Sequence, residues 1–191
     1  WKAYGGGEVR NLVIAKRYAK ALFNLALSEG WVGQYGRELD GFMQLLRDLP
    51  DFADAVQNPL YPEAARKAMF HAVAEKAEMT PIMKSFINLL IEKKRVQHIG
   101  DIAQYYHKLI DEHENVARAQ LKAASELDET IVQEITQTLE NMTGKKVVIE
   151  FQLDPSLIGG VVAQIGDLVL DGSVRRQLRN FKESLKRGAL G

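Results

Sequence analysis

The candidate metal ligands and acid–base groups of the sequence are its four histidines, His71, His98, His107 and His113. No two of them are three or four residues apart, so no helix would present a ready-made pair, and the HExxH motif is absent. Cysteine is also absent, which excludes disulfides, thiolate catalysis and cysteine-ligated zinc or iron–sulfur centres. The histidines are therefore expected on helix surfaces, and no metal site is predicted.

Two glycine-containing turns have some of the composition of phosphate-binding loops. One combines Gly159-Gly160 with Gly166, and the other is Gly144-Lys145-Lys146. The first lacks the GxGxxG spacing, and the second has no Ser or Thr to hold magnesium. Both are interpreted as backbone turns, so the chain is expected to bind no nucleotide and no other cofactor.

Three carboxylates, Asp154, Asp167 and Asp171, lie close enough in the sequence to suggest paired acid–base groups. Each has a local explanation, because Asp154 precedes Pro155, Asp167 would be at a hairpin tip and Asp171 precedes Gly172. No nucleophile, base and orienting group form a set, so catalysis is not expected. A hydrolase with an unrecognised site is the enzyme alternative, and it predicts turnover that is sensitive to Asp171→Ala.

The charges of the 191 residues balance, with 25 Lys and Arg against 25 Asp and Glu. A general nucleic-acid binder needs a surplus of cations to displace counterions, so that class is disfavoured. The run from Arg175 to Arg187 is basic, but Phe181 is its only aromatic residue, and a solvated face or a dock for an acidic protein is the favoured interpretation. No apolar run approaches the ~20 residues of a membrane span, so none is predicted.

These residues would be positioned by an α+β fold with two domains. Residues 1–10 are expected to be a flexible lead-in. Apolar residues then recur every three or four positions and predict a six-helix bundle over 11–114. The expected helices cover 11–28, 32–49, a short piece around 52–56, a segment that Pro62 opens, 82–94 after Thr80-Pro81, and 99–113.

After residue 115 the apolar period changes to two, which predicts a small α/β domain over 115–191. Its expected elements are a strand at 117–123, a helix after a capping box of Ser125 and Asp128, and a strand at 147–153. A hairpin of 160–165 with 168–170 and a last helix from Ser173 complete the domain.

The helices at 11–28 and 82–94 are apolar around most of their circumference. Such helices are either wholly buried in the core of the bundle or line a groove that receives another protein's amphipathic helix. The pattern alone leaves both interpretations open.

Two segments resemble a known family. AKRYAKALFNLALSEG (residues 15–30) is similar to the first helix of the delta subunit of F-type ATP synthases, called oligomycin-sensitivity-conferring protein in mitochondria. DPSLIGGVVAQIGDLVLDGSVRRQLRNF (residues 154–181) resembles the C-terminal signature of that family more closely. Ala163 departs from the larger aliphatic residue usual there, and Asp171-Gly172-Ser173 looks bacterial.

The resemblance implies a non-catalytic stator subunit that resists rotor torque during proton-driven ATP synthesis. The bundle would bind the N-terminal helix of an alpha subunit in a groove between its first and fifth helices. The α/β domain would hold the C-terminal helices of the b subunits, in one copy per complex on the cytoplasmic face of a bacterial plasma membrane. The implied groove residues are Ala15, Tyr18, Ala19, Leu22, Leu25, Ala26, Phe86, Ile87, Leu90 and Ile91, and the C-terminal motif is Gly159, Gly160, Asp171, Gly172 and Ser173.

Two expectations separate the groove from the core interpretation. Leu22→Asp would abolish binding of the alpha-subunit helix and still leave a cooperatively melting domain, unless Leu22 belongs to the core. Trp31, just past the first helix, would report binding by its fluorescence. A free helical adaptor with a regulatory α/β module is the alternative function.

Overall fold

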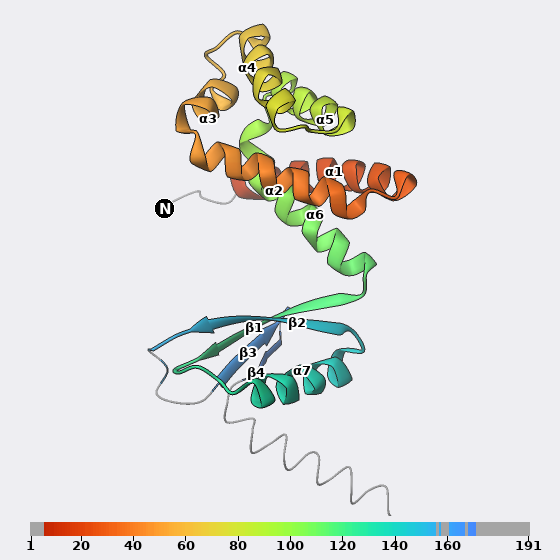
Figure 1. Ribbon diagram of the computed structural model, residues 1–191, viewed down its shortest axis with the longest axis vertical. Helices are drawn as coiled ribbons and strands as arrows, with labels where there is room; N and C mark the ends of the chain where they lie inside the picture. Colours follow the sequence, from red (N-terminus) through yellow and green to blue (C-terminus); the bar gives the residue numbers. More distant parts are fainter. Residues whose placement is uncertain (1–5, 156, 158–160, 167, 171–191) are drawn as a thin grey trace, which may run out of the picture. The chain divides into compact units, whose positions relative to one another are not determined.

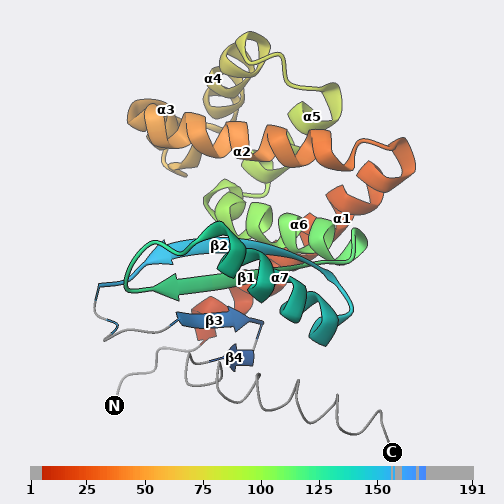
Figure 2. The same ribbon diagram turned by 60° about the horizontal axis from the view of Figure 1, so that its bottom comes forward.

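The computed structural model describes residues 6–155, 157, 161–166 and 168–170. The chain divides into two compact units, Trp1–Ile110 and Asp111–Gly191, with the division inside the last helix of the first unit. Each unit is described separately below. In Figures 1 and 2 the labelled elements of the first unit are all helices, whereas those of the second unit are four strands and the helix α7.

The first unit, called the helical unit here, contains α1 to α6 and one short 3₁₀ helix. α1 begins at Gly6 instead of Asn11, so residues 6–10 of the expected lead-in are helical. Once a helix is nucleated, each further residue adds a hydrogen bond, and this favours extension beyond the amphipathic part. The elements are α1 (Gly6–Glu29), α2 (Val32–Asp48), α3 (Pro50–Gln57), α4 (Glu63–Lys76), α5 (Pro81–Glu92), η1 (Val96–His98) and α6 (Ile99–His113).

These helices share one hydrophobic core. Phe42 of α2 packs edge-on against Phe52 of α3 and Phe70 of α4, with ring centroids 6.3 and 5.8 Å apart. Phe23 of α1 packs in the same way against Tyr106 of α6, at 5.6 Å. Edge-to-face pairs at these distances are favourable beyond their buried area, so the rings join α2 to α3 and α4, and α1 to α6.

The second unit is built on a four-stranded sheet with the strand order β2-β1-β3-β4. β1 (Val116–Ala123) and β2 (Lys146–Leu153) are parallel and joined by α7 (Glu129–Thr143). β3 (Val161–Ile165) and β4 (Leu168–Leu170) form the predicted antiparallel hairpin, and β3 pairs with the other edge of β1. In this register Leu121 of β1 lies between Phe151 of β2 and Ala163 of β3.

α7 packs on the face of the sheet that carries the alternate apolar residues. Leu139 of α7 is buried against Ala119, Val147 and Ile165, one residue from each of the three longer strands. The N-cap of α7 is Asp128, whose carboxylate accepts a hydrogen bond from the Thr130 N–H at 2.8 Å. The predicted capping box, with Ser125 as the N-cap, is therefore three residues too early.

Within the second unit, an arginine of β1 pairs with an aspartate at the start of the unit. Arg118 donates two hydrogen bonds to the Asp111 carboxylate, at 2.7 and 3.0 Å, and a third to Glu150 at 3.3 Å. Bidentate arginine–carboxylate pairs have a fixed geometry. The pair therefore closes a seven-residue span of the chain between the end of α6 and β1.

The part of the chain from Ser173 onward, where the last helix is predicted, lies outside the described residues. None of the described helices combines the length and the apolar character that crossing a bilayer requires.

Candidate functional site: an apolar seam between α1 and α5

α1 and α5, the two helices with unusually broad apolar faces, lie against each other in the helical unit. The Tyr18 ring of α1 meets the Phe86 ring of α5 edge-on, with centroids 6.4 Å apart. Both helices also bury residues in the common core. The structure therefore brings together the two halves of the groove that the family resemblance implies.

Most of the implied groove residues are core residues in this structure. Seven of them are no more than 2 % exposed: Ala15, Ala19, Leu22, Ala26, Ile87, Leu90 and Ile91. Phe86 is 9 % exposed, Tyr18 is half-buried, and Leu25 is 40 % exposed. A docking helix can contact only atoms that reach the surface, so these last three are the residues that remain available.

The helical spacing extends this surface along both helices. Ile14 precedes Tyr18 by four residues. Ala21 and Leu25 follow Tyr18 by three and seven residues, so all of them lie on the same side of α1. Ile82 and Leu89 have the same relation to Phe86 on α5, and Leu89 is 40 % exposed. We call these seven residues the α1/α5 seam: Ile14, Tyr18, Ala21, Leu25, Ile82, Phe86 and Leu89.

Four seam residues, Ile14, Ala21, Ile82 and Leu89, were not among the groove residues taken from the sequence. In the sequence, these four residues could be found from their spacing relative to Tyr18 and Phe86. That spacing identifies them only once the contact between these two rings shows which flank of each helix faces the other. The opposite flank of α1 also carries apolar residues, among them Leu12 and Phe23, and it faces α6 instead.

The start of α5 is held by hydrogen bonds from a neighbouring helix. The Thr80 hydroxyl caps α5 by accepting from the Met83 N–H at 3.3 Å, as Thr80-Pro81 predicts. The Glu38 carboxylate of α2 accepts from both the Thr80 N–H, at 3.1 Å, and the Thr80 hydroxyl, at 2.9 Å. One half-buried carboxylate therefore ties α2 to the end of α5 nearest Ile82.

The C-terminal end of α1 is fixed to α2, which is in turn fixed to α6. The buried Tyr35 of α2 donates a hydrogen bond to Glu29 in the last turn of α1, and the Tyr106 hydroxyl of α6 donates to the Val32 carbonyl at 2.9 Å. Trp31, between α1 and α2, is 47 % exposed and 6.3 Å from the Tyr35 ring. The indole is thus a natural reporter about a turn and a half beyond Leu25.

These contacts predict how stability depends on pH above 9. Burial, and secondarily Glu29, raises the pKa of Tyr35 to about 12 from an ordinary value near 10. Because the folded state holds this proton more tightly, its contribution is complete below pH 10 and is lost as the pH rises towards 12. The midpoint of urea denaturation of the wild type should therefore fall between pH 10 and 12. The midpoint of the Tyr35→Phe variant should fall less steeply over the same range.

The matched control is Tyr61→Phe, in the exposed loop between α3 and α4, which should decline as the wild type does. Equal slopes for Tyr35→Phe and the wild type would contradict the assignment.

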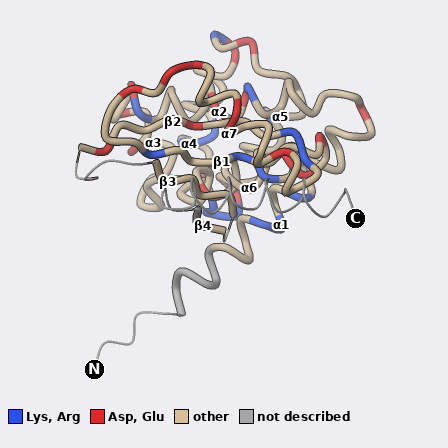
Figure 3. The backbone as a smooth tube through the Cα atoms, turned by 90° about the horizontal axis from the view of Figure 1, so that it is seen from below, with Lys and Arg blue, Asp and Glu red and all other residues tan. Residues whose placement is uncertain are grey.

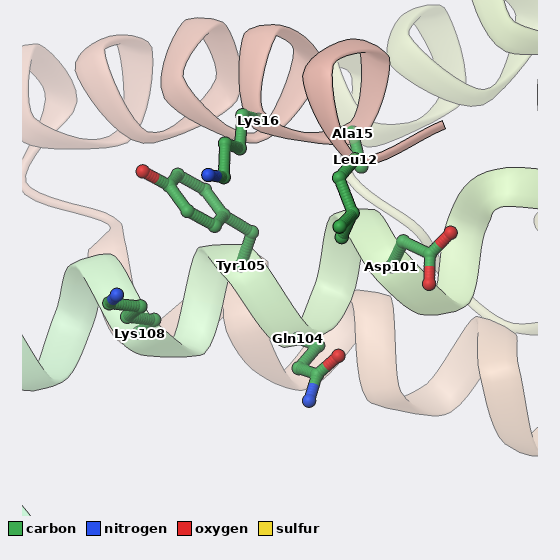
Figure 4. Close-up of a pocket in the computed structure, with 7 residues that line it drawn as sticks. All are labelled: Leu12, Ala15, Lys16, Asp101, Gln104, Tyr105 and Lys108. Atoms are coloured by element: carbon green, nitrogen blue, oxygen red, sulfur yellow. The ribbon is translucent and has the colours of Figure 1, made fainter. Parts of the chain in front are cut away.

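On the α6 side, α1 borders a shallow pocket of about 200 Å³. Figure 4 shows Leu12, Ala15 and Lys16 of α1 above Tyr105, Gln104 and Lys108 of α6, with Asp101 at one end. The Lys16 ammonium is 5.6 Å from the centre of the Tyr105 ring, a cation–π distance. The lining has no nucleophile beside a base, so the pocket has no catalytic set.

Three of the histidines lie at separate places in the helical unit, and His113 lies in the last turn of α6, inside the second unit. His71 contacts Asn88 at 3.0 Å, His107 contacts Asp40 at 2.8 Å, and His98 is buried. In the part of the chain that is described, no three His, Asp or Glu side chains are grouped closely enough to hold a metal ion.

All five residues of the C-terminal motif, Gly159, Gly160, Asp171, Gly172 and Ser173, lie outside the described residues, as does Asp167.

Comparison with known proteins shows the family. The family model described as "ATP synthase delta (OSCP) subunit" matches residues 14–185. ATP synthase subunit delta of Syntrophobacter fumaroxidans is 69% identical over 183 residues, which cover 96% of this chain and 100% of that protein. The corresponding subunit of Desulfosudis oleivorans is 44% identical over 180 residues, covering 94% of this chain and 98% of that protein.

A solved structure agrees with the fold. A chain of the Toxoplasma gondii mitochondrial ATP synthase hexamer superposes with a TM-score of 0.62 at 21% identity, covering 90% of this chain and 96% of that one. The chain therefore belongs to the ATP synthase delta (OSCP) subunit family, whose members are peripheral, non-catalytic subunits in the stalk of the membrane-bound F-type ATP synthase.

Proposed function

We propose that the helical unit binds the N-terminal helix of an alpha subunit along the α1/α5 seam, and thereby attaches the stalk to the catalytic head. The observation that carries this proposal is the seam itself. Its apolar side chains recur at three- and four-residue spacing on two adjoining helices, and several of them, including Leu25 and Leu89, are substantially exposed. An amphipathic helix recognises such a surface through anchors of the same spacing.

This binding mode suits a mechanical role. A stator must stay attached while the rotor turns, so it needs slow dissociation, and affinity differences between related complexes are mostly differences in dissociation rate. Apolar burial provides this better than exposed ion pairs, which are screened by salt and contribute about 0–1 kcal/mol each. The seam would therefore hold the head against rotation while chemistry proceeds in other subunits.

The second unit is the proposed attachment point for the C-terminal helices of the b subunits. Its described surface includes Phe151 and Leu153 at the end of the edge strand β2, which are 41 % and 47 % exposed on the face that α7 covers only in part. The relatives are bacterial ATP synthase delta subunits, and we infer from this a peripheral place on the cytoplasmic face of the inner membrane, in one copy per complex.

The test of the seam uses Trp31 as a probe. In a Trp1→Phe variant of the full chain, Trp31 is the single tryptophan, since the sequence contains two. Titration with a synthetic peptide of the alpha-subunit N-terminal segment should change its emission saturably, and calorimetry should show a 1:1 complex. Absence of both the fluorescence change and the heat would contradict helix binding at the seam.

A further inference from the structure

We propose that the helix bound at the α1/α5 seam carries acidic residues on the flank that faces Arg17 and Lys20 of α1. This inference rests on the proposed function and adds the charge of the partner. It follows from an excess of positive charge in the middle of α1, where two of the cations make no hydrogen bond, ion pair or ring contact within the described part of the chain.

The middle of α1 contains positive charges and no negative ones. Between Val9 and Ser28 the sequence contains four cations, Arg10, Lys16, Arg17 and Lys20, and no Asp or Glu. In Figure 3 the blue segments at the α1 label mark Lys and Arg on this helix. Two other described helices, α3 and α7, have the opposite imbalance, with acidic residues and no Lys or Arg. Cations elsewhere can be paired within the fold, as in α4, where Lys67 contacts Glu63 at 2.6 Å.

Position connects these cations to the seam. Arg17 is three residues after Ile14 and four before Ala21, so it lies directly beside the seam on α1. Lys20 follows Arg17 by three residues and Lys16 by four, so it lies between these two cations on the exposed side of the helix. In the described part of the chain neither side chain makes a hydrogen bond, an ion pair or a ring contact, whereas Lys16 lies over the Tyr105 ring of α6.

The other side of the seam is basic as well. Lys93, at the C-cap of α5, is four residues after Leu89, and Lys94 follows it. Glu92 is the acidic group at this end, and its carboxylate contacts Lys93 at 3.1 Å and Lys67 at 3.4 Å. The apolar strip is therefore bordered by positive charge on both helices, and a partner with acidic flanks is the electrostatic complement.

An anionic membrane is the other class of partner with this chemistry. The observations favour a helix, because the exposed Leu25 and Leu89 belong to one apolar strip shared by two helices that meet at Tyr18 and Phe86, and a docking helix matches such a strip.

The experiment compares three versions of the alpha-subunit peptide with the full chain: the native sequence, one with every Asp and Glu changed to Asn and Gln, and one with every Asp and Glu changed to Lys. At 50 mM salt the native peptide should associate about tenfold faster than the neutral one, and the difference should shrink at 500 mM. Arg17→Glu combined with Lys20→Glu should reduce the association rate of the native peptide by a similar factor and increase the association rate of the Lys peptide.

The control is Lys145→Glu combined with Lys146→Glu, the same change of charge at two exposed residues of the second unit, which should leave the order of the three peptides unchanged. Equal rates for the three peptides would overturn the acidic-partner inference and leave docking at the seam intact. Absence of binding by all three would instead contradict the proposed function. Stronger binding to phosphatidylglycerol vesicles than to any peptide, lost in Arg17→Glu/Lys20→Glu, would also overturn the inference, in favour of a membrane.

Discussion

Leu25→Asp is expected to weaken binding of the alpha-subunit helix at least 100-fold and to leave the folding of the helical unit almost unchanged. Covering a leucine removes apolar area worth roughly 1.5–3 kcal/mol, and a carboxylate in its place must also be desolvated. A factor of 100 corresponds to about 2.7 kcal/mol, so the first effect alone nearly accounts for it. Calorimetric affinity and the thermal melt of the same sample are the two measurements.

Leu27→Asp is the matched control for this prediction. Leu25 and Leu27 are both 40 % exposed on α1, but two residues of helix separate their directions by about 200°. The control should therefore lose little affinity. Equal losses for the two variants would show that the seam is not the binding surface, and an unchanged affinity in Leu25→Asp would have the same meaning.

Leu22→Asp is expected to unfold the helical unit, with a loss in the free energy of unfolding of more than about 4 kcal/mol. Leu22 is 2 % exposed in the core, where an aspartate would be an unpaired buried charge. Leu22→Ala should remain folded and lose about 2–5 kcal/mol, the range for core leucines. Urea denaturation followed by circular dichroism measures both variants.

This expectation differs from the one drawn from the sequence, in which Leu22→Asp abolishes binding without unfolding. The burial of Leu22 is the reason for the difference, because a residue that the helices already cover offers no surface to a partner. A Leu22→Asp protein that melts cooperatively near the wild-type temperature but fails to bind would restore Leu22 to the docking surface. Substitutions at Leu25 and Leu22 therefore have different expected effects on the same helix: the first lowers the affinity for the partner, and the second lowers the stability of the helical unit.

Much of the fold can be predicted from the sequence because local signals determine it. The three- and four-residue apolar period places α2, α5 and α6 within a residue or two of their observed ends, and Thr80-Pro81 marks the start of α5. Period-two alternation and the Gly166 turn likewise predict β1, β2 and the β3–β4 hairpin. Capping is less certain, since Ser125 and Asp128 are both good N-caps and only the path of the chain selects Asp128.

The partner surface is where local signals are insufficient. Helical period distinguishes apolar flanks from polar ones, but core residues such as Leu22 and surface residues such as Leu25 have the same period and the same chemistry. The arrangement of α1 between α5 and α6 decides which of them is covered, and the Tyr18–Phe86 contact identifies the flank that faces α5. The strand order β2-β1-β3-β4 is a further tertiary result, because alternation does not specify which edge of β1 receives β3.

The sequence by itself therefore determined the kinds of elements, their order, the absence of a catalytic constellation and the resemblance to the delta family. Only the tertiary structure decided which apolar residues form the core and which form the α1/α5 seam. The physical reason is that burial depends on every helix packed around a residue, whereas the pattern along one helix records only its own amphipathic face.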